Sequence, residues 1–360
     1  MFRCPRFLTR CSVSVRSIGV FSAMLVGCPA ATPYLIDVWT PYEGLPQSQV
    51  LSIAQTPDGY LWISTQLGWI ARFDGIRFTH FNPENTPVLD SPEIRKLWVH
   101  DRGVLWIADV NGQLISLTGD DFKERVVAKP GLAKQVVEWL GRKGEVPRFV
   151  TADGTLLSLG AKVIYEKNNN PAEAESGGIK QFCQDAEGVM WCHTLDGQLG
   201  RWQEGRFHRE TDTGIPANTQ VTSLRSSPTG DLWIGTDAGL WRRRAGVISR
   251  AVPGLSAADL QILQLAPTPD GNLWLRTPAG VVLTRGDAVV HSTALTGMDE
   301  TPPLRPLEMH ADSDGGVWVV KYGCGVWHVD ARGALTVLSS RNGLPSDLVE
   351  TWFEDREKII

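Results

Sequence analysis

Histidine is the side chain in this sequence with the widest chemical use, but its spacing does not form a recognisable site. The chain contains seven histidines: His80, His100, His193, His208, His291, His310 and His328. None stands in an HxH or HExxH spacing, and zinc sites need ligands that converge from such close positions. No metal site, no cofactor and no catalytic residue are predicted.

Other short motifs also favour structure over chemistry. The run DSDGG at 312–316 is similar to part of a calcium loop, but it lacks the spaced third acid and the distal Glu. A hairpin turn is predicted there instead. The chain has no GxSxG elbow, no P-loop and no GxGxxG after an expected strand. His310 can line a tunnel, although a packed or hydrogen-bonded histidine is the favoured interpretation.

Three cysteines follow the first 31 residues, namely Cys183, Cys192 and Cys324. Cys183 and Cys192 lie on consecutive expected strands, so a diagonal cross-strand disulfide can form in an oxidising compartment. Three cysteines cannot all pair, and the chain is not a disulfide scaffold.

The first 31 residues have the pattern of a secretory signal. They carry four arginines and no acid, then the apolar run 17–27 and the small residues CPAAT. This run is too short to span a bilayer as a helix. The segment LVGC at 25–28 also resembles a lipobox, which would make Cys28 a lipidated residue. Cleavage near Ala31 is favoured, because no polar tether separates Cys28 from the first expected strand at 34–40.

The remaining chain is acidic. Without the leader it carries 31 Lys and Arg against 40 Asp and Glu, a formal charge of −9. No basic stripe is left, which argues against nucleic acid and anionic membrane surfaces as partners. An exported, periplasmic protein is predicted, anchored to the membrane if Cys28 is lipidated.

A repeat determines the expected architecture. The pattern of Gly, two residues and Trp returns along the chain, and its tryptophans are Trp62, Trp106, Trp191, Trp233, Trp274 and Trp318. Their steps are 44, 85, 42, 41 and 44 residues. The step of 85 covers two periods and contains a repeat at 136–159, in which Arg148 is expected at the Trp place. Seven repeats of 41–44 residues are typical of propeller blades.

Each repeat divides into four short strand-like runs, at 50–55, 60–65, 69–73 and 77–81 in the first. Turn residues separate the runs. The predicted fold is all-β, a seven-bladed β-propeller of four-stranded antiparallel blades. The repeated tryptophans are expected to fill the space between blades, where each buried ring contributes on the order of a few kcal/mol.

The two ends of the chain suggest how the ring is closed. Residues 35–40 are expected to pair with 325–329 as the outer strand of blade seven, because propellers must cover open edges. Residues 342–357 repeat 42–58, and 334–340 together with them look like the beginning of a second propeller. The expected organisation is a signal peptide at 1–31, the propeller at 32–340 and the truncated start of an eighth repeat at 341–360.

The pattern from Trp39 to Gly75, with its GLP start and its RFDG end, resembles the two-component regulator propeller repeat. That family builds the extracytoplasmic sensors of bacterial hybrid histidine kinases. The resemblance implies a ligand-binding sensor for an oligosaccharide or another small polar ligand. It also implies a second propeller or the remainder of a sensor kinase as partners. The sequence contains no phosphoacceptor-His region, ATP lid or transmembrane helix, so kinase activity is not expected.

Two alternatives remain open. Streptogramin lyases are also seven-bladed propellers, but they need a histidine and acid cluster with a divalent ion at the axis, which Lys321 and His310 alone do not supply. A lipoprotein scaffold for protein contacts is the other alternative. The GLP and RFDG segments favour the sensor.

A propeller also predicts where a ligand would bind. The connections between blades and the second-to-third strand bends share one face and form a funnel around the axis, where binding residues concentrate. Amides, carboxylates and a Tyr suit a sugar. The expected lining residues are Gln47, Gln49, Gln66, Asp109, Asn111, Asp153, Lys180, Asp196, Gln220, Asp237, Arg305, Lys321 and Tyr322.

Overall fold

The computed structural model describes most of the chain between residues 34 and 360, together with a short piece near the N-terminus. The described residues are 2–3, 34–67, 70–89, 93–99, 103–110, 113–119, 121–126, 136–140, 148–151, 156–159, 163–166, 179–203, 206–295, 308–320 and 323–360. Between 136 and 166, and at 2–3, 124–126 and 206, the backbone alone is described. The predicted signal peptide, including Cys28, lies almost entirely outside these ranges.

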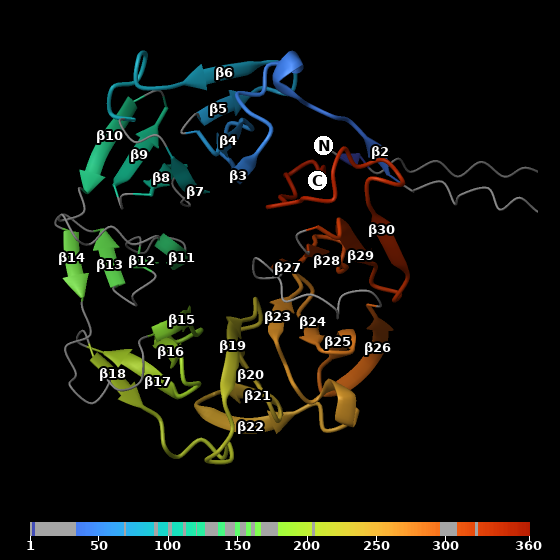
Figure 1. Ribbon diagram of the computed structural model, residues 1–360. Helices are drawn as coiled ribbons and strands as arrows, with labels where there is room; N and C mark the ends of the chain where they lie inside the picture. Colours follow the sequence, from blue (N-terminus) through green and yellow to red (C-terminus); the bar gives the residue numbers. More distant parts are fainter. Residues whose placement is uncertain are drawn as a thin grey trace, which may run out of the picture.

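The strands form seven four-stranded antiparallel sheets that stand side by side around a common axis (Figure 1). In each sheet the strands follow one another in sequence order, and the first strand faces the centre. We number the sheets as blades one to seven from the N-terminus. An all-β propeller of four-stranded antiparallel blades is therefore confirmed. Six blades are described with their side chains and blade three by its backbone.

The strand bounds follow the repeat. Blade by blade they are β3 (Val50–Gln55), β4 (Leu61–Thr65), β5 (Ile70–Phe73), β6 (Phe78–Phe81); β7 (Ile94–Val99), β8 (Leu105–Asp109), β9 (Leu114–Thr118), β10 (Asp121–Val126); β11 (Val136–Leu140), β12 (Arg148–Thr151), β13 (Leu156–Leu159), β14 (Val163–Glu166); β15 (Ile179–Gln184), β16 (Met190–Thr194), β17 (Leu199–Gln203), β18 (Arg206–Arg209); β19 (Val221–Ser226), β20 (Leu232–Thr236), β21 (Gly239–Arg244), β22 (Val247–Ala251); β23 (Gln264–Pro267), β24 (Leu273–Thr277), β25 (Gly280–Arg285), β26 (Ala288–Ala294); β27 (Glu308–Ala311), β28 (Val317–Val320), β29 (Val326–Val329) and β30 (Leu335–Leu338).

Four short described elements lie outside the blades. They are the pair β1 (Phe2–Arg3) and β2 (Leu35–Ile36) and the single-turn 3₁₀ helices η1 (Pro41–Glu43) and η3 (Ala257–Asp259). Within the described residues, no helix is long and apolar enough to cross a membrane.

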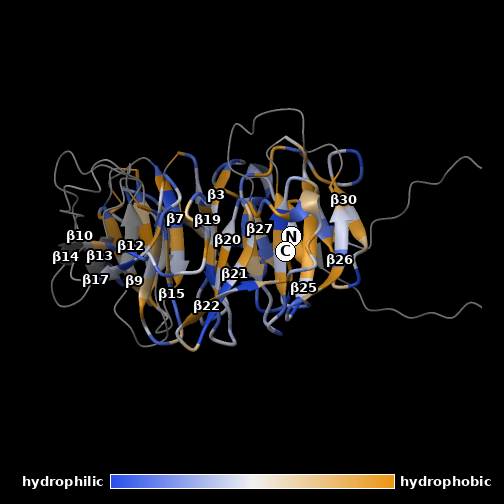
Figure 2. Ribbon diagram, turned by 90° about the horizontal axis from the view of Figure 1, so that it is seen from below, coloured by the Kyte–Doolittle hydropathy of each residue, from blue (hydrophilic) through white to orange (hydrophobic). Residues whose placement is uncertain are grey.

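The repeated tryptophans form the core of the ring, as predicted. All six are buried, and each lies opposite the inner strand of its own blade. Four of them, Trp62, Trp191, Trp233 and Trp274, pack against the next blade. Trp233, for example, contacts Ile262, Leu265 and Leu275 in blade six. Seen edge-on, the strands carry the apolar residues and the loops at both rims are largely hydrophilic (Figure 2).

The strand register of blade three corrects the sequence analysis. In the other blades the tryptophan pairs with the inner-strand residue at one fixed place, such as Ala54 opposite Trp62. In blade three that place is Trp139, and its partner is Phe149, not Arg148. Phe149 also lies 43 residues after Trp106, within the range of the repeat. Arg148 lies 42 residues after Trp106 and also fits the repeat, so only the strand pairing distinguishes the two positions.

The expected latch between the N-terminus and blade seven does not form. The outer neighbour of β29 is β30, so residues 334–340 complete blade seven instead of beginning another propeller. The tight turn at 330–334, in which Ala334 N–H donates to Asp330 Oδ1 at 2.8 Å, places β30 directly beside β29. A strand that follows through a short turn takes the edge before a distant segment can.

Two smaller expectations are settled by the strand pairing. Cys183 and Cys192 form no disulfide, because Cys183 lies opposite Trp191 while Cys192 follows Trp191 on the same strand. Neighbouring residues of a strand point to opposite faces of the sheet, so the two thiols are on different faces and the disulfide is excluded. The run DSDGG forms the hairpin turn between β27 and β28, as predicted.

Candidate functional site

The connections between blades and the second-to-third strand bends lie on the same face of the disc. Backbone hydrogen bonds join them in several blades: Gln66 N–H donates to Gln49 O at 3.1 Å, and Asp237 N–H donates to Gln220 O at 3.1 Å. In each pair one residue precedes an inner strand and the other follows a second strand. The geometry expected for a funnel face is therefore present in these blades.

Eight of the thirteen expected lining residues are described. Asn111, Asp153, Arg305, Lys321 and Tyr322 lie outside the described residues. Gln66, Lys180, Asp196, Gln220 and Asp237 are exposed, and Gln47 and Gln49 are half-buried.

Asp109 does not have the exposure expected of a lining residue. Its side chain is buried, and Asp109 Oδ1 accepts a hydrogen bond from Gln113 N–H at 2.6 Å. This carboxylate is held within the bend between β8 and β9.

The polar residues of blades four and five come together on this face. Gln220 N–H donates to Asp237 Oδ1 at 2.9 Å. Gly197 lies against Gln220, because Val221 N–H donates to Gly197 O at 2.8 Å. Asp196 therefore stands beside the same connection, where it accepts from Gln198 Nε2 at 2.6 Å. Two carboxylates and an amide, all exposed, face solvent within one stretch of the rim.

At blade one the corresponding residues are held by the C-terminal segment. Gln49 Nε2 donates to Glu350 Oε1 at 2.5 Å, and Gln49 N–H donates to Gln47 Oε1 at 3.2 Å. These contacts leave less of Gln49 free for a ligand than Gln220 and Asp237 have.

Sequence analysis did not identify a polar ring on the inner strands. Two positions before the partner of each blade tryptophan, every described blade with side chains has a polar residue, and these are Ser52, Lys96, Gln181, Ser223, Gln264 and Glu308. Some of them join neighbouring blades: Leu97 N–H donates to Ser52 Oγ at 3.1 Å, and Leu224 N–H donates to Gln181 Oε1 at 2.8 Å. Aligning the repeats on their tryptophans would have found this ring.

Charged groups of different blades influence one another across the axis. Burial raises the pKa of Glu308, and Lys96 of blade two opposes this rise. Burial among the surrounding strands lowers the pKa of His310 to about 4, and the positive charges of Arg225 and Lys96 act in the same direction. The His310 side chain is 56% exposed to water, and its ring lies edge-on to that of Trp352 with the centroids 5.3 Å apart. Its exposure agrees with the possible tunnel-lining role, and its contact with Trp352 agrees with the favoured packed histidine.

His193 is the opposite case. It is completely buried, and the backbones of Thr194 and Val221 provide polar groups beside its ring. Burial lowers its pKa to about 3, and the positive charges of Lys180 and Arg225 contribute. It is a neutral histidine at neutral pH and is not placed to exchange protons with a ligand.

A third histidine forms a chain of hydrogen bonds in blade seven. Tyr34 Oη lies 2.6 Å from His328 Nδ1, and His328 Nε2 lies 2.8 Å from Asp312 Oδ2. Burial opposes ionisation of Asp312, but the bonds from His328 and from backbone N–H groups hold its pKa below the usual value. The His328 ring stacks on Trp318 at 4.3 Å between centroids. This arrangement attaches the segment before blade one to blade seven.

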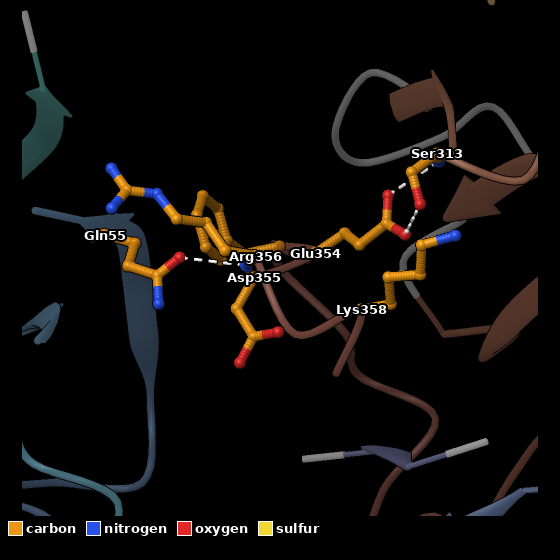
Figure 3. A pocket seen from close by; sticks show the side chains of 7 residues that line it. Gln55, Ser313, Glu354, Asp355, Arg356 and Lys358 are labelled. Atoms are coloured by element: carbon orange, nitrogen blue, oxygen red, sulfur yellow. Dashed lines mark hydrogen bonds between the residues drawn. The ribbon is translucent and has the colours of Figure 1, made fainter. Parts of the chain in front are cut away.

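A polar cavity of about 350 Å³ lies where the C-terminal segment meets blades one and seven (Figure 3). Glu354 accepts two hydrogen bonds from Ser313, from N–H at 2.8 Å and from Oγ at 2.7 Å. On the other side Arg356 N–H donates to Gln55 Oε1 at 2.9 Å. The polar groups are thus engaged in joining chain segments. Among the described residues, no group of three or more His, Cys, Asp or Glu is placed to hold a metal ion.

The comparisons with known proteins agree with this architecture. Residues 44–66 match the sequence family described as Two component regulator propeller. No curated protein sequence matches the chain.

The solved structures that are similar at TM-score 0.51 include the following three. A streptogramin B lyase is 17% identical, with 77% of this chain and 92% of that chain covered. The extracellular domain of BT3049 from B. thetaiotaomicron, described as a hybrid two component system, is 18% identical, with 81% of this chain and 41% of that chain covered. BamB from Moraxella catarrhalis is 14% identical, with 79% and 86% covered. At these identities the likeness shows the fold alone; the chain is a β-propeller that carries a two-component regulator propeller repeat.

Proposed function

We propose that this chain is the exported, ligand-binding propeller of a two-component sensor, and that it binds an oligosaccharide or another small polar ligand on its funnel face. The two-component regulator propeller repeat at 44–66 supports the sensor assignment. The leader at 1–31 supports export, because its pattern is that of a secretory signal.

The observation that carries the proposal is the exposed polar cluster of Asp196, Gln220 and Asp237 on the face where connections and bends meet. Carboxylates and amides accept and donate in-plane hydrogen bonds, which suits the hydroxyl groups of a sugar. A rigid ring of blades holds these loops in place, as binding sites on loops require.

Nothing in the described part of the chain favours a catalytic role. His193 is enclosed, His328 is held by Tyr34 and Asp312, and His310 has no acid cluster for a divalent ion around it.

The test is thermal-shift screening of the purified chain against an oligosaccharide library, with and without EDTA. A ligand that binds only the folded state raises the melting temperature by mass action. One glycan class is expected to give a metal-independent rise that the double variant Gln220→Ala, Asp237→Ala loses. The control variant is Gln203→Ala, an exposed amide at the bend between β17 and β18 on the opposite face. No shift for any glycan, or equal shifts in both variants, would contradict the proposal.

A further inference from the structure

Three basic side chains stand at successive heights on the inner strands, counted from the funnel face. Lys180 is the second residue of β15, Lys96 the third of β7 and Arg225 the fifth of β19. These strands begin on the funnel face, and they face the centre of the ring (Figure 1). Because a strand rises about 3.3 Å per residue, the three cations lie within about 10 Å of one another in height.

The cation nearest the funnel face is placed by a β-bulge. The pairing of β15 with β16 shifts between Ile179 and Gln181, so Lys180 has no partner on β16. A bulge bends the strand and turns the extra residue out of the ladder. Lys180 is exposed and Lys96 is half-buried, and neither forms an ion pair with another residue that the structure describes. Both ammonium groups are therefore available for an anion.

The three cations act on residues of other strands around the centre. Arg225 lies at the height of His310 in blade seven, because each pairs with the tryptophan of its own blade. Burial lowers the pKa of His310, and Arg225 and Lys96 lower it further. Burial likewise lowers the pKa of His193, with Lys180 and Arg225 acting in the same direction. Blades two, four and five thus direct positive charge to one region.

The nearby carboxylates do not balance these cations. Glu93, just before β7, pairs with Arg95 at 2.6 Å. Burial raises the pKa of Glu308, which weakens this group as a counter-charge. Asp196 and Asp237 accept hydrogen bonds within the rim itself. Among the side chains that the structure describes, this region therefore holds more positive than negative charge, and such a region attracts anions.

Neutral donors stand beside the cations. Gln181 follows Lys180 in β15, and its Oε1 accepts from Leu224 N–H at 2.8 Å. This bond fixes the amide, so its Nε2 group points its N–H donors away from Leu224. Arg225 is anchored at the same residue, since its Nη1 donates to Leu224 O at 3.0 Å. Ammonium, guanidinium and amide N–H groups are the donors that bind an oxyanion.

We propose that Lys180, Lys96 and Arg225 bind an oxyanion group of the ligand, so that the funnel face recognises an acidic sugar and not a neutral one. The inference rests on the proposed function for the sugar itself, whose hydroxyl groups Gln220 and Asp237 would bind. Gln220 directly precedes β19, and Lys180 lies at the same end of the neighbouring β15. The two sets of donors therefore adjoin on one face. A carboxylate, a sulfate and a phosphate share the required chemistry.

The test compares galactose with derivatives that differ from it in one charged group. These are galacturonate and galactose that carries a sulfate or a phosphate on its primary hydroxyl. Saturation-transfer NMR with the full chain detects weak binding of each, and line broadening of inorganic phosphate in its phosphorus spectrum probes the anion site without a sugar. The test variants are Lys180→Gln and Lys96→Gln. The matched control is Lys123→Gln, since Lys123 is 56% exposed on the outer strand β10 and pairs with Asp121.

At least one acidic derivative is expected to bind roughly tenfold more tightly than galactose, because it gains charge-assisted hydrogen bonds. Each test variant should lose roughly this factor, whereas Lys123→Gln should not change it. Added sodium chloride should weaken the acidic derivative and leave galactose unaffected. The derivative that binds most tightly identifies the oxyanion.

Equal binding of galactose and all its acidic derivatives would overturn the proposal, as would equal weakening in Lys180→Gln and Lys123→Gln. Binding of galactose alone would keep the sugar-binding function and overturn the oxyanion site. Broadening of phosphate that both test variants abolish, without binding of any sugar, would keep the oxyanion site and contradict the sugar-binding function. If neither phosphate nor an acidic sugar binds, the oxyanion site is wrong.

Discussion

The junction between blades six and seven and the junction between blades seven and one are built from the same repeat, yet they are closed in different ways. At the first, Trp274 is completely buried and donates from Nε1 to Gly315 O of the next blade at 3.0 Å. At the second, Trp318 meets a segment without strand pairing, joined to its neighbours mostly by side chains at the rim. Comparing the two junctions separates the stability that a complete blade contributes from the stability that the C-terminal segment contributes.

The largest expected effect is on the tryptophan of the closed junction. Trp274→Ala should lower the free energy of unfolding by roughly 4 kcal/mol, because the residue is fully buried and the ring around it cannot collapse into the space. Trp352→Ala, at the open junction, should cost only about 1 kcal/mol, since Trp352 is half-buried. Urea unfolding followed by circular dichroism measures both. Equal costs would mean that the C-terminal segment closes the ring as well as a blade does.

The same contrast holds for ion pairs. Arg243 Nη1 of blade five lies 2.7 Å from Asp185 Oδ2 of blade four, and Asp185 also accepts from Trp191 Nε1 at 2.8 Å. Asp185 is buried, so Asp185→Ala leaves Arg243 without its buried partner and should cost roughly 3 kcal/mol. Asp314, which pairs with Lys358 at the open junction, is exposed, so Asp314→Ala should cost less than about 1 kcal/mol. Added salt should reduce only the second cost, and a salt-sensitive first pair would contradict this interpretation.

Features of the two junctions that depend on neighbouring residues could be predicted from the sequence, whereas features that depend on contacts between distant segments could not. The strands of blade one and the burial of the tryptophans were predicted because alternation and turn residues are local signals. The position of residues 35–40 was predicted wrongly. A short turn places β30 beside β29, so the distant segment does not pair there. The sequence allowed a disulfide between Cys183 and Cys192. In the structure Cys183 lies opposite Trp191, the residue before Cys192, so the two thiols are on opposite faces of the sheet.

The candidate site shows the same limit. The face on which Gln220 and Asp237 meet was predicted, because the order of strands in a blade determines which loops share a rim. The burial of Asp109 was not predicted, because a carboxylate in this bend can either face solvent, as Asp196 and Asp237 do, or accept from a backbone N–H within the bend, as Asp109 does from Gln113. The influence of Lys96 on Glu308 and His310 joins blades two and seven, which only the closed ring brings together.

The next prediction concerns the pH dependence of the closed junctions. The folded pKa of His193 is about 3, against 6.5 for an ordinary histidine. As pH falls below 6.5 the unfolded chain takes up this proton first, so the folded state loses about 1.4 kcal/mol per pH unit until about pH 3. His193→Leu should remove this slope, because leucine takes up no proton in either state.

The control for His193 is His310→Gln. His310 is 56% exposed, so solvent screens its charge and the change in slope should be smaller. Urea midpoints at pH 7, 5.5 and 4.5 measure the slopes. Parallel profiles for wild type and His193→Leu would show that His193 is protonated in the folded state or is not enclosed.

The smallest effects distinguish the two turns that the repeat forms at this junction. Gly59 has φ +93° and Lys358 has φ +62°, a left-handed conformation that strains any residue with a Cβ by roughly 1 kcal/mol. Nothing lies near the position of a Cβ at Gly59, so Gly59→Ala tests the backbone alone and should cost about 1 kcal/mol in urea unfolding.

Lys358→Gly should release similar strain from the C-terminal turn, less the small contribution of the exposed pair with Asp314. Hydrogen exchange of the Ile359 amide, which donates to Asp355 Oδ1 at 2.7 Å, should then slow severalfold while global stability stays the same. If exchange slows together with a rise in global stability, the C-terminal segment unfolds with the ring and is part of its closure. If only exchange slows, the segment opens by itself and does not contribute to ring closure.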